Sequence, residues 1–342
     1  MINLRSDTFT QPTKKMREHM ACAPVGDDAY GEDPSVNALQ ERCRELFEKE
    51  DALFVTSGMM ANRLSYLAQT NPGDEVITGY AYHVNCFDSA PMCAFAGVVM
   101  NTLHPKNGII TPYDVLNALN TKQRYEYFAQ PKVISIENSI NGLSGKIFPF
   151  ETQKELFELA KQKGLNLHLD GARLWNAHVA TGIPLSEYAK YTDTLSVCFS
   201  KGLGAPYGSM LMGPKEVIQK ARRFRLWLGG GVHQTGMLAA GAHYSLSHIP
   251  SLQDDHEHAK LFANAIEELG CVHCDLENVQ TNIVQFSLDE PNPNFYEECE
   301  KEGLLLFPWL PNTYRAVFHR DIQREDVEKA VSIISKREAL CR

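Results

Sequence analysis

The chain has 342 residues, 44% of them hydrophobic and 22% charged, a composition that is ordinary for a globular protein and excludes a disordered segment. The formal net charge of −9 argues against a nucleic-acid partner and against binding to an anionic membrane surface. Nine cysteines at irregular spacing do not form a disulfide framework or a metal site, and no apolar run is long enough to span a membrane, so we expect a cytoplasmic protein.

The first residues lack both the apolar segment of a secretory signal and the alternation of a strand, so we expect an arm outside the main sheet. Ser35 is expected to cap a helix, because apolar residues follow it at helical spacing. Further helices are expected at Met60–Ala68 and Thr152–Lys163. Seven segments are strand-like: Ala52–Val55, Glu75–Thr78, Gly97–Asn101, Lys132–Ile136, Asn166–Leu169, Thr194–Phe199 and Gly208–Met212. Their alternation with helices predicts an α/β domain with a mostly parallel sheet.

The pattern changes near residue 245, where His248-Ile249-Pro250 interrupts it and a helix over Asp254–Leu269 opens a new segment. Since 342 residues is long for one compact domain, we expect more than one. The predicted division is an N-terminal arm over residues 1–20, a large domain over 21–245 and a smaller C-terminal domain over 246–342.

The most informative segment ends a predicted strand in Ser200 and Lys201, followed by glycines that allow a sharp turn. A partly desolvated lysine there can form a Schiff base with pyridoxal 5′-phosphate (PLP), and the hydroxyl of Ser200 can bind the cofactor phosphate. The alternative is a surface lysine in a glycine-rich loop, which is the commoner meaning of such a triplet. The assignment of Lys201 as the Schiff-base lysine therefore depends on support from other segments.

A second strand, Asn166–Leu169, delivers Asp170 at its carboxyl end, where open α/β sheets bind ligands. A carboxylate there can pair with a protonated pyridine nitrogen, and Arg173 can bind a carboxylate or a phenolate oxygen. The alternative is an ordinary helix N-cap aspartate followed by an unrelated arginine.

Small residues also mark a strand-to-helix turn at Thr56-Ser57-Gly58-Met59. Backbone amides at the start of a helix form an anion site suited to phosphate. A ligand-free connection is an equally good explanation of this turn alone. No GxxxxGK[ST] or GxGxxG pattern occurs, so a nucleotide-binding loop is not indicated, and Gly229-Gly230-Gly231 is interpreted as a tight turn.

Three further residues complete the set of candidates. His83 can stack on a pyridine ring and take part in proton transfer, although a single loop histidine is more often a structural hydrogen-bonding group. Ser6 and Arg315 are candidate anchors for a substrate carboxylate, each weak by itself.

Together these segments resemble the threonine aldolase family, within the β-eliminating lyase group of fold-type I PLP enzymes. The resemblance runs along the whole chain, through LRSDTFTQPT, PVGDDAYGEDPSVNALQ, SGMMAN, SIENSINGLSGKIFP, LHLDGARLWNA, SVCFSKGLGAPYGSMLMG and GGGVHQTG. It implies a large domain with a mostly parallel seven-stranded sheet flanked by helices, and a smaller C-terminal α+β domain. It also implies a homo-oligomer, a dimer or a tetramer, with sites at the dimer interface.

The resemblance assigns roles to individual residues. It implies Lys201 as the Schiff-base lysine, Asp170 as the partner of the pyridine nitrogen, His83 stacked on the ring, Gly58, Met59 and Ser200 at the phosphate, and Arg173, Ser6 and Arg315 at the substrate carboxylate. Arg173 would also lie near the phenolate oxygen, and Tyr30 would approach the site of a neighbouring subunit.

Four positions depart from the family pattern. Met59 replaces a threonine at the phosphate turn, and His233 replaces an arginine near the phosphate, exchanging a permanent cation for one that titrates near neutral pH. Ile140 stands where the family has histidine in its Glu-Asn-Thr-His segment. Tyr127 aligns, across a loop, with a further histidine near the β-hydroxyl.

The implied activity is cleavage of a small β-hydroxy-α-amino acid, L-threonine or L-allo-threonine, to glycine and an aldehyde by a retro-aldol reaction. Two alternatives remain within PLP chemistry, a β-eliminating lyase and an aldolase that prefers bulkier side chains such as that of phenylserine. A third is a non-catalytic protein of the same fold, motivated by the altered phosphate ligands.

Overall fold

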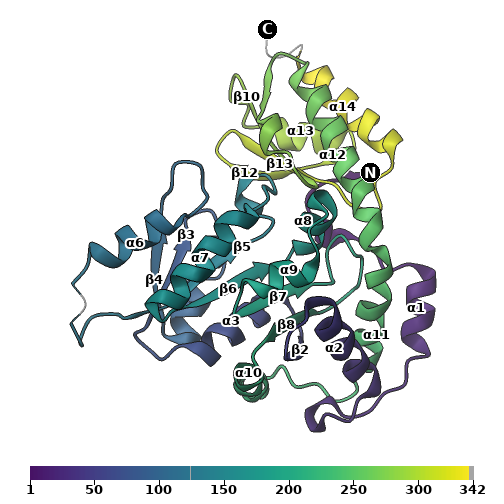
Figure 1. Cartoon of the computed structure of the whole chain (residues 1–342). Helices are drawn as coiled ribbons and strands as arrows, with labels where there is room; N and C mark the ends of the chain where they lie inside the picture. Colours follow the sequence, from purple (N-terminus) through teal and green to yellow (C-terminus); the bar gives the residue numbers. More distant parts are fainter. Residues whose placement is uncertain (124, 339–342) are drawn as a thin grey trace.

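The computed structural model describes residues 1–123 and 125–338 and is built around a seven-stranded sheet (Figure 1). The sheet strands are β2 (Asp51–Val55), β3 (Glu75–Gly79), β4 (Val99–Leu103), β5 (Pro131–Glu137), β6 (Asn166–Gly171), β7 (Thr194–Cys198) and β8 (Ser209–Gly213). Their order is β2-β8-β7-β6-β5-β3-β4, and only β8 runs antiparallel to its neighbours. The predicted mostly parallel α/β fold is confirmed, and each predicted strand lies within two residues of its observed ends.

Helices cover both faces of this sheet, because parallel strands whose two faces are both apolar must be shielded from water on both sides. The helices of the chain are α1 (Lys14–Ala21), α2 (Pro34–Phe47), α3 (Gly58–Gln69), α4 (His83–Cys86), α5 (Ser89–Pro91), α6 (Pro112–Asn120), α7 (Phe150–Lys163), α8 (Leu174–Thr181), α9 (Leu185–Lys190), α10 (Lys215–Trp227), α11 (Gly236–Ser245), α12 (Leu252–Glu267), α13 (Phe295–Lys301) and α14 (Arg324–Glu338). Short 3₁₀ turns are η1 (Asp7–Phe9), η2 (Asp28–Tyr30), η4 (Asn141–Leu143), η5 (Leu246–Ser251) and η6 (Leu276–Asn278), and η3 (Met92–Ala96) is a π-helix. One core cluster packs α7, α8 and α9 against the sheet, and another packs α3 and α10 against β2 and β8.

Several predicted helix boundaries were wrong by a few residues, for reasons of capping. Asp33, and not Ser35, caps α2, because its carboxylate accepts from the amides of Ser35 and Val36 while Pro34 occupies the first helical position. The helix predicted to begin at Met60 begins at Gly58, because the Ser57 hydroxyl accepts from the Met60 amide.

The remaining helix predictions differ in the same way. The helix predicted from Thr152 is α7, which begins at Phe150, and the one predicted over Asp254–Leu269 is α12, Leu252–Glu267. The strand predicted from Gly97 begins at Val99, because Gly97, with φ of 65°, ends the preceding π-helix in a left-handed conformation.

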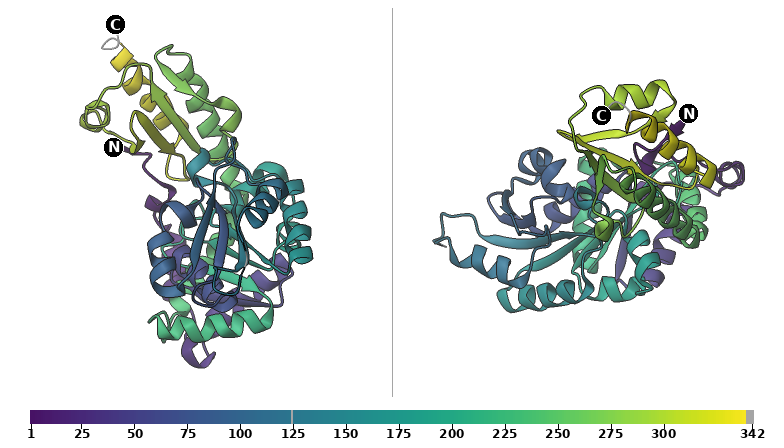
Figure 2. Two further views of the ribbon diagram at one scale, coloured as in Figure 1. Left: turned by 90° about the vertical axis from the view of Figure 1, so that its left-hand side faces the viewer. Right: turned by 90° about the horizontal axis from the view of Figure 1, so that it is seen from above.

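The C-terminal part forms a separate four-stranded antiparallel sheet that stands above the main sheet in Figure 1 and in the left view of Figure 2. Its strands are β9 (Val272–Cys274), β10 (Ile283–Leu288), β12 (Phe307–Leu310) and β13 (Thr313–Val317), in the order β12-β13-β10-β9. A further core cluster joins this sheet to α12, α13 and α14.

The chain begins in this C-terminal part and not in the main sheet. Strand β1 (Ile2–Asn3) pairs in parallel with β11 (Leu304–Leu305), and Ile2 and Leu4 are buried in the C-terminal core. The boundaries at residues 20 and 245 stay a prediction, and residues 339–342 of the predicted small domain lie outside the described residues. Within the described residues, no helix has both the length and the apolar character that a membrane crossing requires.

The order of the sheet decides where a site can form. Strands β2, β3, β5, β6 and β7 run in one direction, so their carboxyl ends meet along one edge of the sheet. The segments that follow β2, β3, β6 and β7 carry most of the residues singled out in the sequence, as the rule for ligand sites in open α/β sheets predicts.

Candidate active site

A cavity of about 240 Å³ lies at this edge of the main sheet. It is lined by Thr8, Ser57, Gly58, Met59, Asn62, His83, Asp170, Ala172, Cys198, Ser200 and Lys201. Six of the predicted site residues are therefore brought together from four separate strand ends: Gly58, Met59, His83, Asp170, Ser200 and Lys201. Sequence reasoning missed the other lining residues, of which Asn62 has the clearest role.

Lys201 lies just beyond β7, in a loop whose backbone is fixed from two sides. The carbonyl of Lys201 accepts from the Gly204 amide at 2.8 Å and from the Thr10 hydroxyl at 2.9 Å. Gly204 has φ of 78°, a left-handed conformation that favours glycine at this turn. The N-terminal arm thus helps to hold the lysine at the cavity.

Asp170 lies at the end of β6 and its carboxylate is held by two donors. Oδ2 accepts from Nδ2 of Asn62 at 2.7 Å, and Oδ1 accepts from the Ala172 amide at 3.0 Å. Asn62 is oriented in turn by the Ser196 hydroxyl, which donates to its Oδ1 at 2.8 Å. Asp170 is not the N-cap of the next helix, because that position is taken by Arg173. A buried carboxylate with a fixed orientation is what a protonated ring nitrogen requires.

The start of α3 forms the opposite wall of the cavity. The first amides of a helix have no partner within it, so those of Gly58 and Met59 are available to an anion. A Cβ at Gly58 would lie only 2.7 Å from Sγ of Cys198, which explains why glycine is needed at this turn.

His83 begins α4, whereas the sequence placed it in a loop. Its amide donates to Oε2 of Glu137 at 2.6 Å, and its ring packs against Phe87 with the centroids 5.1 Å apart. Nδ1 is buried and has no hydrogen-bond partner in the described parts of the chain. Burial lowers the pKa of His83, so its imidazole is neutral and Nδ1 can accept a proton or a hydrogen bond.

Glu137 is a buried acid that the sequence did not single out as a site residue. It ends β5 directly beside Asp170 in the sheet register, and its Oε1 accepts from the Asn141 amide at 2.9 Å. Burial and the neighbouring charge of Asp170 raise the pKa of Glu137. Its position at the end of a predicted strand, matching that of Asp170, was the available signal.

Arg173 is buried and its guanidinium is occupied by Asp7 from the N-terminal arm. Nε donates to Oδ2 of Asp7 at 2.8 Å and Nη2 to Oδ1 at 2.7 Å, a bidentate ion pair. Burial opposes ionisation of Asp7, but the charge and hydrogen bonds of Arg173 hold its pKa well below the usual range. In this structure the ion pair fixes the N-terminal arm to the end of β6, and contact of Arg173 with a substrate carboxylate stays a prediction.

Arg315 retains the free donor that Arg173 lacks. Nη1 donates to Oδ1 of Asn141 at 2.9 Å and Nη2 to the carbonyl of Arg5 at 3.1 Å. Nε is buried and without a partner among the described residues, which fits a ligand that brings its own acceptor. Asn141 Oδ1 also accepts from Arg173 at 3.4 Å, so the two arginines are held side by side.

Residues 3–289 match the family described as beta-eliminating lyase. The chain belongs to the β-eliminating lyase family. It is 38% identical to the low specificity L-threonine aldolase of Escherichia coli K12, over 97% of this chain and 98% of that one. It is 36% identical to the probable low-specificity L-threonine aldolase 2 of Arabidopsis thaliana, over 98% and 96%. The protein is therefore a lyase, and the non-catalytic alternative is not supported.

Solved structures agree on the fold of this lyase. The threonine aldolase of Leishmania major superposes with a TM-score of 0.85 at 19% identity and covers 98% of this chain and 99% of its own. An aspartate aminotransferase of Thermus thermophilus gives 0.74 at 16%, covering 98% and 91%. The predicted fold-type I architecture is confirmed.

Arg173 and Arg315 do not line the cavity of the lyase, and neither do three further predicted ligand residues. The Ser6 hydroxyl accepts from the Thr8 amide at 3.2 Å and caps η1, and Thr8, not Ser6, reaches the cavity. Nδ1 of His233 lies 2.8 Å from Oδ2 of Asp27, and the His233 side chain is 70% exposed. Tyr30 is 80% exposed in the same surface segment. Contacts of these three residues with cofactor or substrate stay predictions.

The remaining departures from the family pattern also have defined positions. Ile140 is fully buried in the main core and its amide donates to the carbonyl of Lys146 at 2.8 Å. Tyr127 is 80% exposed, and its ring packs against Phe128 with the centroids 4.5 Å apart. Neither side chain lines the cavity that holds Lys201.

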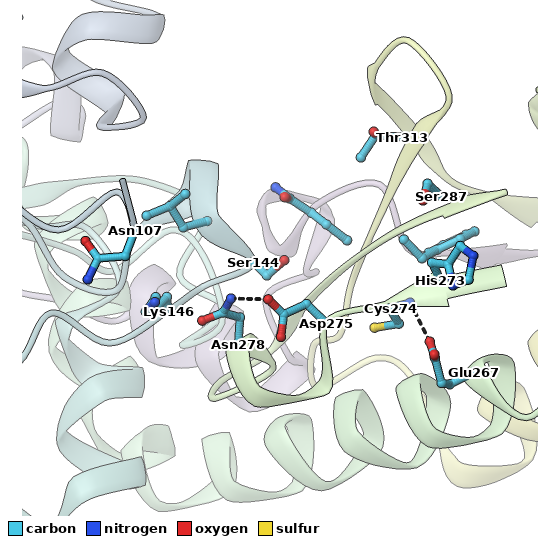
Figure 3. A pocket seen from close by; sticks show the side chains of 13 residues that line it. Asn107, Ser144, Lys146, Glu267, His273, Cys274, Asp275, Asn278, Ser287 and Thr313 are labelled. Atoms are coloured by element: carbon cyan, nitrogen blue, oxygen red, sulfur yellow. Dashed lines mark hydrogen bonds between the residues drawn. The ribbon is translucent and has the colours of Figure 1, made fainter. Parts of the chain in front are cut away.

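A larger cavity, of about 450 Å³, lies between the two sheets of the lyase (Figure 3). Lys146 and Asn107 lie on one wall, and residues of α12, β9 and β10 on the other. Its two carboxylates already have partners, since Glu267 accepts from the Cys274 amide and Asp275 from Nδ2 of Asn278. None of the predicted site residues lines this cavity, so size alone does not identify the site.

The ion pair between Asp7 and Arg173 yields a stability prediction. Asp7→Asn leaves the buried guanidinium without its counter-charge, which is expected to lower the free energy of unfolding by about 3–5 kcal/mol. Urea unfolding followed by circular dichroism measures this loss. The control is Asp254→Asn, an exposed carboxylate on α12, which should change stability by less than about 1 kcal/mol. Equal losses in the two variants would contradict the role of the pair.

Asp255, on α12 behind the Lys201 loop, is an unusual acid. Its side chain is 2% exposed and its Oδ2 has no partner among the described residues. Burial, with Asp7 adding to it, raises the pKa of Asp255 to about 8. The folded lyase therefore keeps this proton through most of the neutral range.

This proton makes stability fall as pH rises. Between pH 6.5 and 8 the unfolded chain has released the proton of Asp255 and the folded chain still holds it, so unfolding becomes more favourable. His168 and His256, whose folded pKa values are about 4, are neutral in the folded chain, and in the unfolded chain they lose their remaining protons in the lower part of this window. That loss favours folding as pH rises, and it is the same in the wild-type protein and in Asp255→Asn. The free energy of unfolding, measured in urea, should fall by about 1–2 kcal/mol less across this range in Asp255→Asn than in the wild-type protein. An unchanged slope in Asp255→Asn would contradict the assignment.

Proposed function

We propose that this lyase binds PLP at the Lys201 cavity and cleaves L-threonine or L-allo-threonine to glycine and an aldehyde. The observation that carries the proposal is the meeting of Lys201, Asp170 and the start of α3 on one cavity. Family membership supports the reaction class, and the names of the relatives, low-specificity threonine aldolases, support the substrate class.

The residues present fit the cofactor. The amides of Gly58 and Met59, with the hydroxyl of Ser200, offer donors to a phosphate. Asp170 offers a fixed carboxylate to a ring nitrogen, and Nδ1 of His83 is buried with no hydrogen-bond partner among residues 1–123 and 125–338. Lys201 offers the amine that attaches the aldehyde carbon of PLP.

Asp170, His83 and Lys201 have different roles in the proposed reaction. When bound, PLP supplies an electron sink for the pair released as the Cα–Cβ bond of the substrate breaks. Asp170 would hold the proton of the ring nitrogen, which would strengthen that sink. The neutral His83 can take the proton of the β-hydroxyl at Nδ1, and Nζ of Lys201 can return a proton to Cα.

Arg315 is the residue proposed to hold the substrate carboxylate. Its Nε is buried without a partner in the described structure, and its two Nη atoms are fixed by Asn141 and Arg5. A carboxylate bound at this donor would be oriented by a guanidinium that is already held in place, which lowers the entropic cost of reaching a reactive geometry. Arg173 supports the same position through Asn141.

We also propose a homo-oligomer, a dimer or tetramer, in the cytoplasm. The loops that carry Tyr30 and His233 are joined, since the Asp28 amide donates to the carbonyl of His233 at 3.0 Å and Asp28 pairs with the buried Arg225. Both side chains are exposed, as contact with a neighbouring subunit would require. The cysteines in the described part of the chain are all free, which suits a reducing compartment.

Product analysis tests the proposed activity. Purified protein incubated with PLP and L-threonine, L-allo-threonine or phenylserine should release glycine and the matching aldehyde in equal amounts. Ammonia and a keto acid would instead identify β-elimination and contradict the aldolase proposal. Inactivity towards all three amino acids would also contradict it.

A further inference from the structure

Three aromatic side chains, Phe87, Phe307 and Trp309, form a cluster between His83 and Arg315. The ring of Phe87 lies 5.1 Å from that of His83, and Trp309 lies 5.7 Å from Phe87. Phe307 packs on Trp309 with the centroids 6.1 Å apart. The cluster therefore joins α4 of the main part of the chain to β12 of the C-terminal sheet.

Trp309 also contacts the proposed carboxylate-binding residue. The guanidinium carbon of Arg315 lies 4.6 Å from the Trp309 ring centroid and 4.9 Å from that of Phe307. Such contacts between a cation and aromatic rings are favourable, while the guanidinium itself is held by its hydrogen bonds to Asn141 and to the carbonyl of Arg5. Trp309 is thus the side chain that links the carboxylate end of the site to Phe87 and His83.

The cluster is not part of the core. Phe87 is 48% exposed, Phe307 is 40% exposed and Trp309 is half-buried, so a face of the cluster remains open to a ligand. Aromatic surface left open beside buried polar groups is typical of ligand sites, in which a few polar groups fix the orientation and apolar walls receive the rest.

We propose that Trp309 determines specificity for the side chain on the β-carbon of the substrate, and that it selects an aryl group over a methyl group. The inference rests on the proposed function, because it requires the carboxylate at Arg315 and the α-carbon near Lys201. A substrate placed in this way would extend between Arg315 and His83, and the aromatic cluster contacts both of these residues. The three aromatic side chains lie outside the lining of the Lys201 cavity, so they would meet the substrate beyond the reacting atoms. An aryl ring gains stacking and apolar contact there that a methyl group cannot supply.

The test compares Trp309→Ala and Trp309→Phe with the wild-type holoenzyme. For L-threo-phenylserine, Trp309→Ala should lower kcat/KM at least about tenfold, mainly through a higher KM, whereas the value for L-threonine should change less than about threefold. Trp309→Phe should recover most of the loss. The control is Tyr113→Ala, an exposed aromatic side chain on α6, which should change neither value.

Binding of amino acids that cannot undergo the cleavage separates this role from a structural one. The dissociation constant of L-phenylalanine, measured by calorimetry, should rise about tenfold in Trp309→Ala while that of L-alanine stays within about threefold. Equal weakening of both would mean that Trp309 only positions Arg315, and no weakening would mean that it does not meet the side chain. Either result overturns the inference. Failure of the wild-type enzyme to release glycine would overturn the proposed function instead, and the two dissociation constants would still decide the role of Trp309.

Discussion

Lys201→Ala is expected to leave the purified protein without its visible absorbance band and to lower kcat/KM at least about a thousandfold. Lys201 is the only lysine among the described residues that line the cavity, so no neighbouring amine can replace it. Borohydride should abolish the band in the wild-type protein and have no effect on the variant. Absorbance spectra and steady-state kinetics measure both results.

The control for Lys201→Ala is Lys215→Ala, a surface lysine at the start of α10. It should keep the band and the activity of the wild-type protein. The Lys201 variant should also unfold at a urea concentration close to that of the wild-type apoprotein, because the contacts of its loop are made by the backbone carbonyl. A variant that keeps the band and the activity would show that Lys201 is not the point of attachment.

The sheet and most of the cavity could be predicted because their signals are local. Each strand has its own apolar pattern, and in a parallel sheet the residues after several strands meet at one edge. Asp170, Lys201 and Gly58 follow that rule. The resemblance to a known family added the roles, but the placement followed from the order of the elements.

The contacts that sequence reasoning missed are those between distant segments. Asp7 meets Arg173 across 166 positions, and no local pattern shows that the arm returns to the end of β6. The same reason hides Glu137, whose importance comes from its neighbours His83 and Asn141 rather than from its own segment. The sequence therefore did not indicate that the Arg173 guanidinium is paired with Asp7.

Met59 and His233, the two departures from the family pattern at the predicted phosphate site, are also explained by where they lie in the fold. Met59 loses a hydroxyl, but the amides at the start of α3 remain, and these depend on the helix rather than on the side chain. His233 lies on an exposed loop with Asp27 and not on the cavity of its own chain. The predicted contact of His233 with the cofactor phosphate therefore requires the proposed oligomer, in which it would be made to a neighbouring subunit.

Asp170→Asn is expected to lower kcat/KM by about 100- to 1000-fold and to weaken the binding of PLP. The neutral amide cannot keep a proton on the ring nitrogen, so the electron sink on which cleavage depends is lost. The cost to folding should be much smaller, about 1–2 kcal/mol, because Asn62 loses a charged acceptor while Glu137 loses a repelling neighbour. With Asp170 neutral, the pKa of Glu137 should fall towards its ordinary value.

Kinetics, a PLP titration and urea unfolding of the apoprotein separate these effects. Asp254→Asn serves again as the control, and it should match the wild-type protein in all three. A loss of activity that merely follows a large loss of stability would show that Asp170 is a structural residue. Full activity in Asp170→Asn would show that the ring nitrogen has another partner. We expect instead that Asp170→Asn loses activity and affinity for PLP but still folds. Asn62 and Ala172 orient the Asp170 carboxylate towards the cavity, where a ligand can use it.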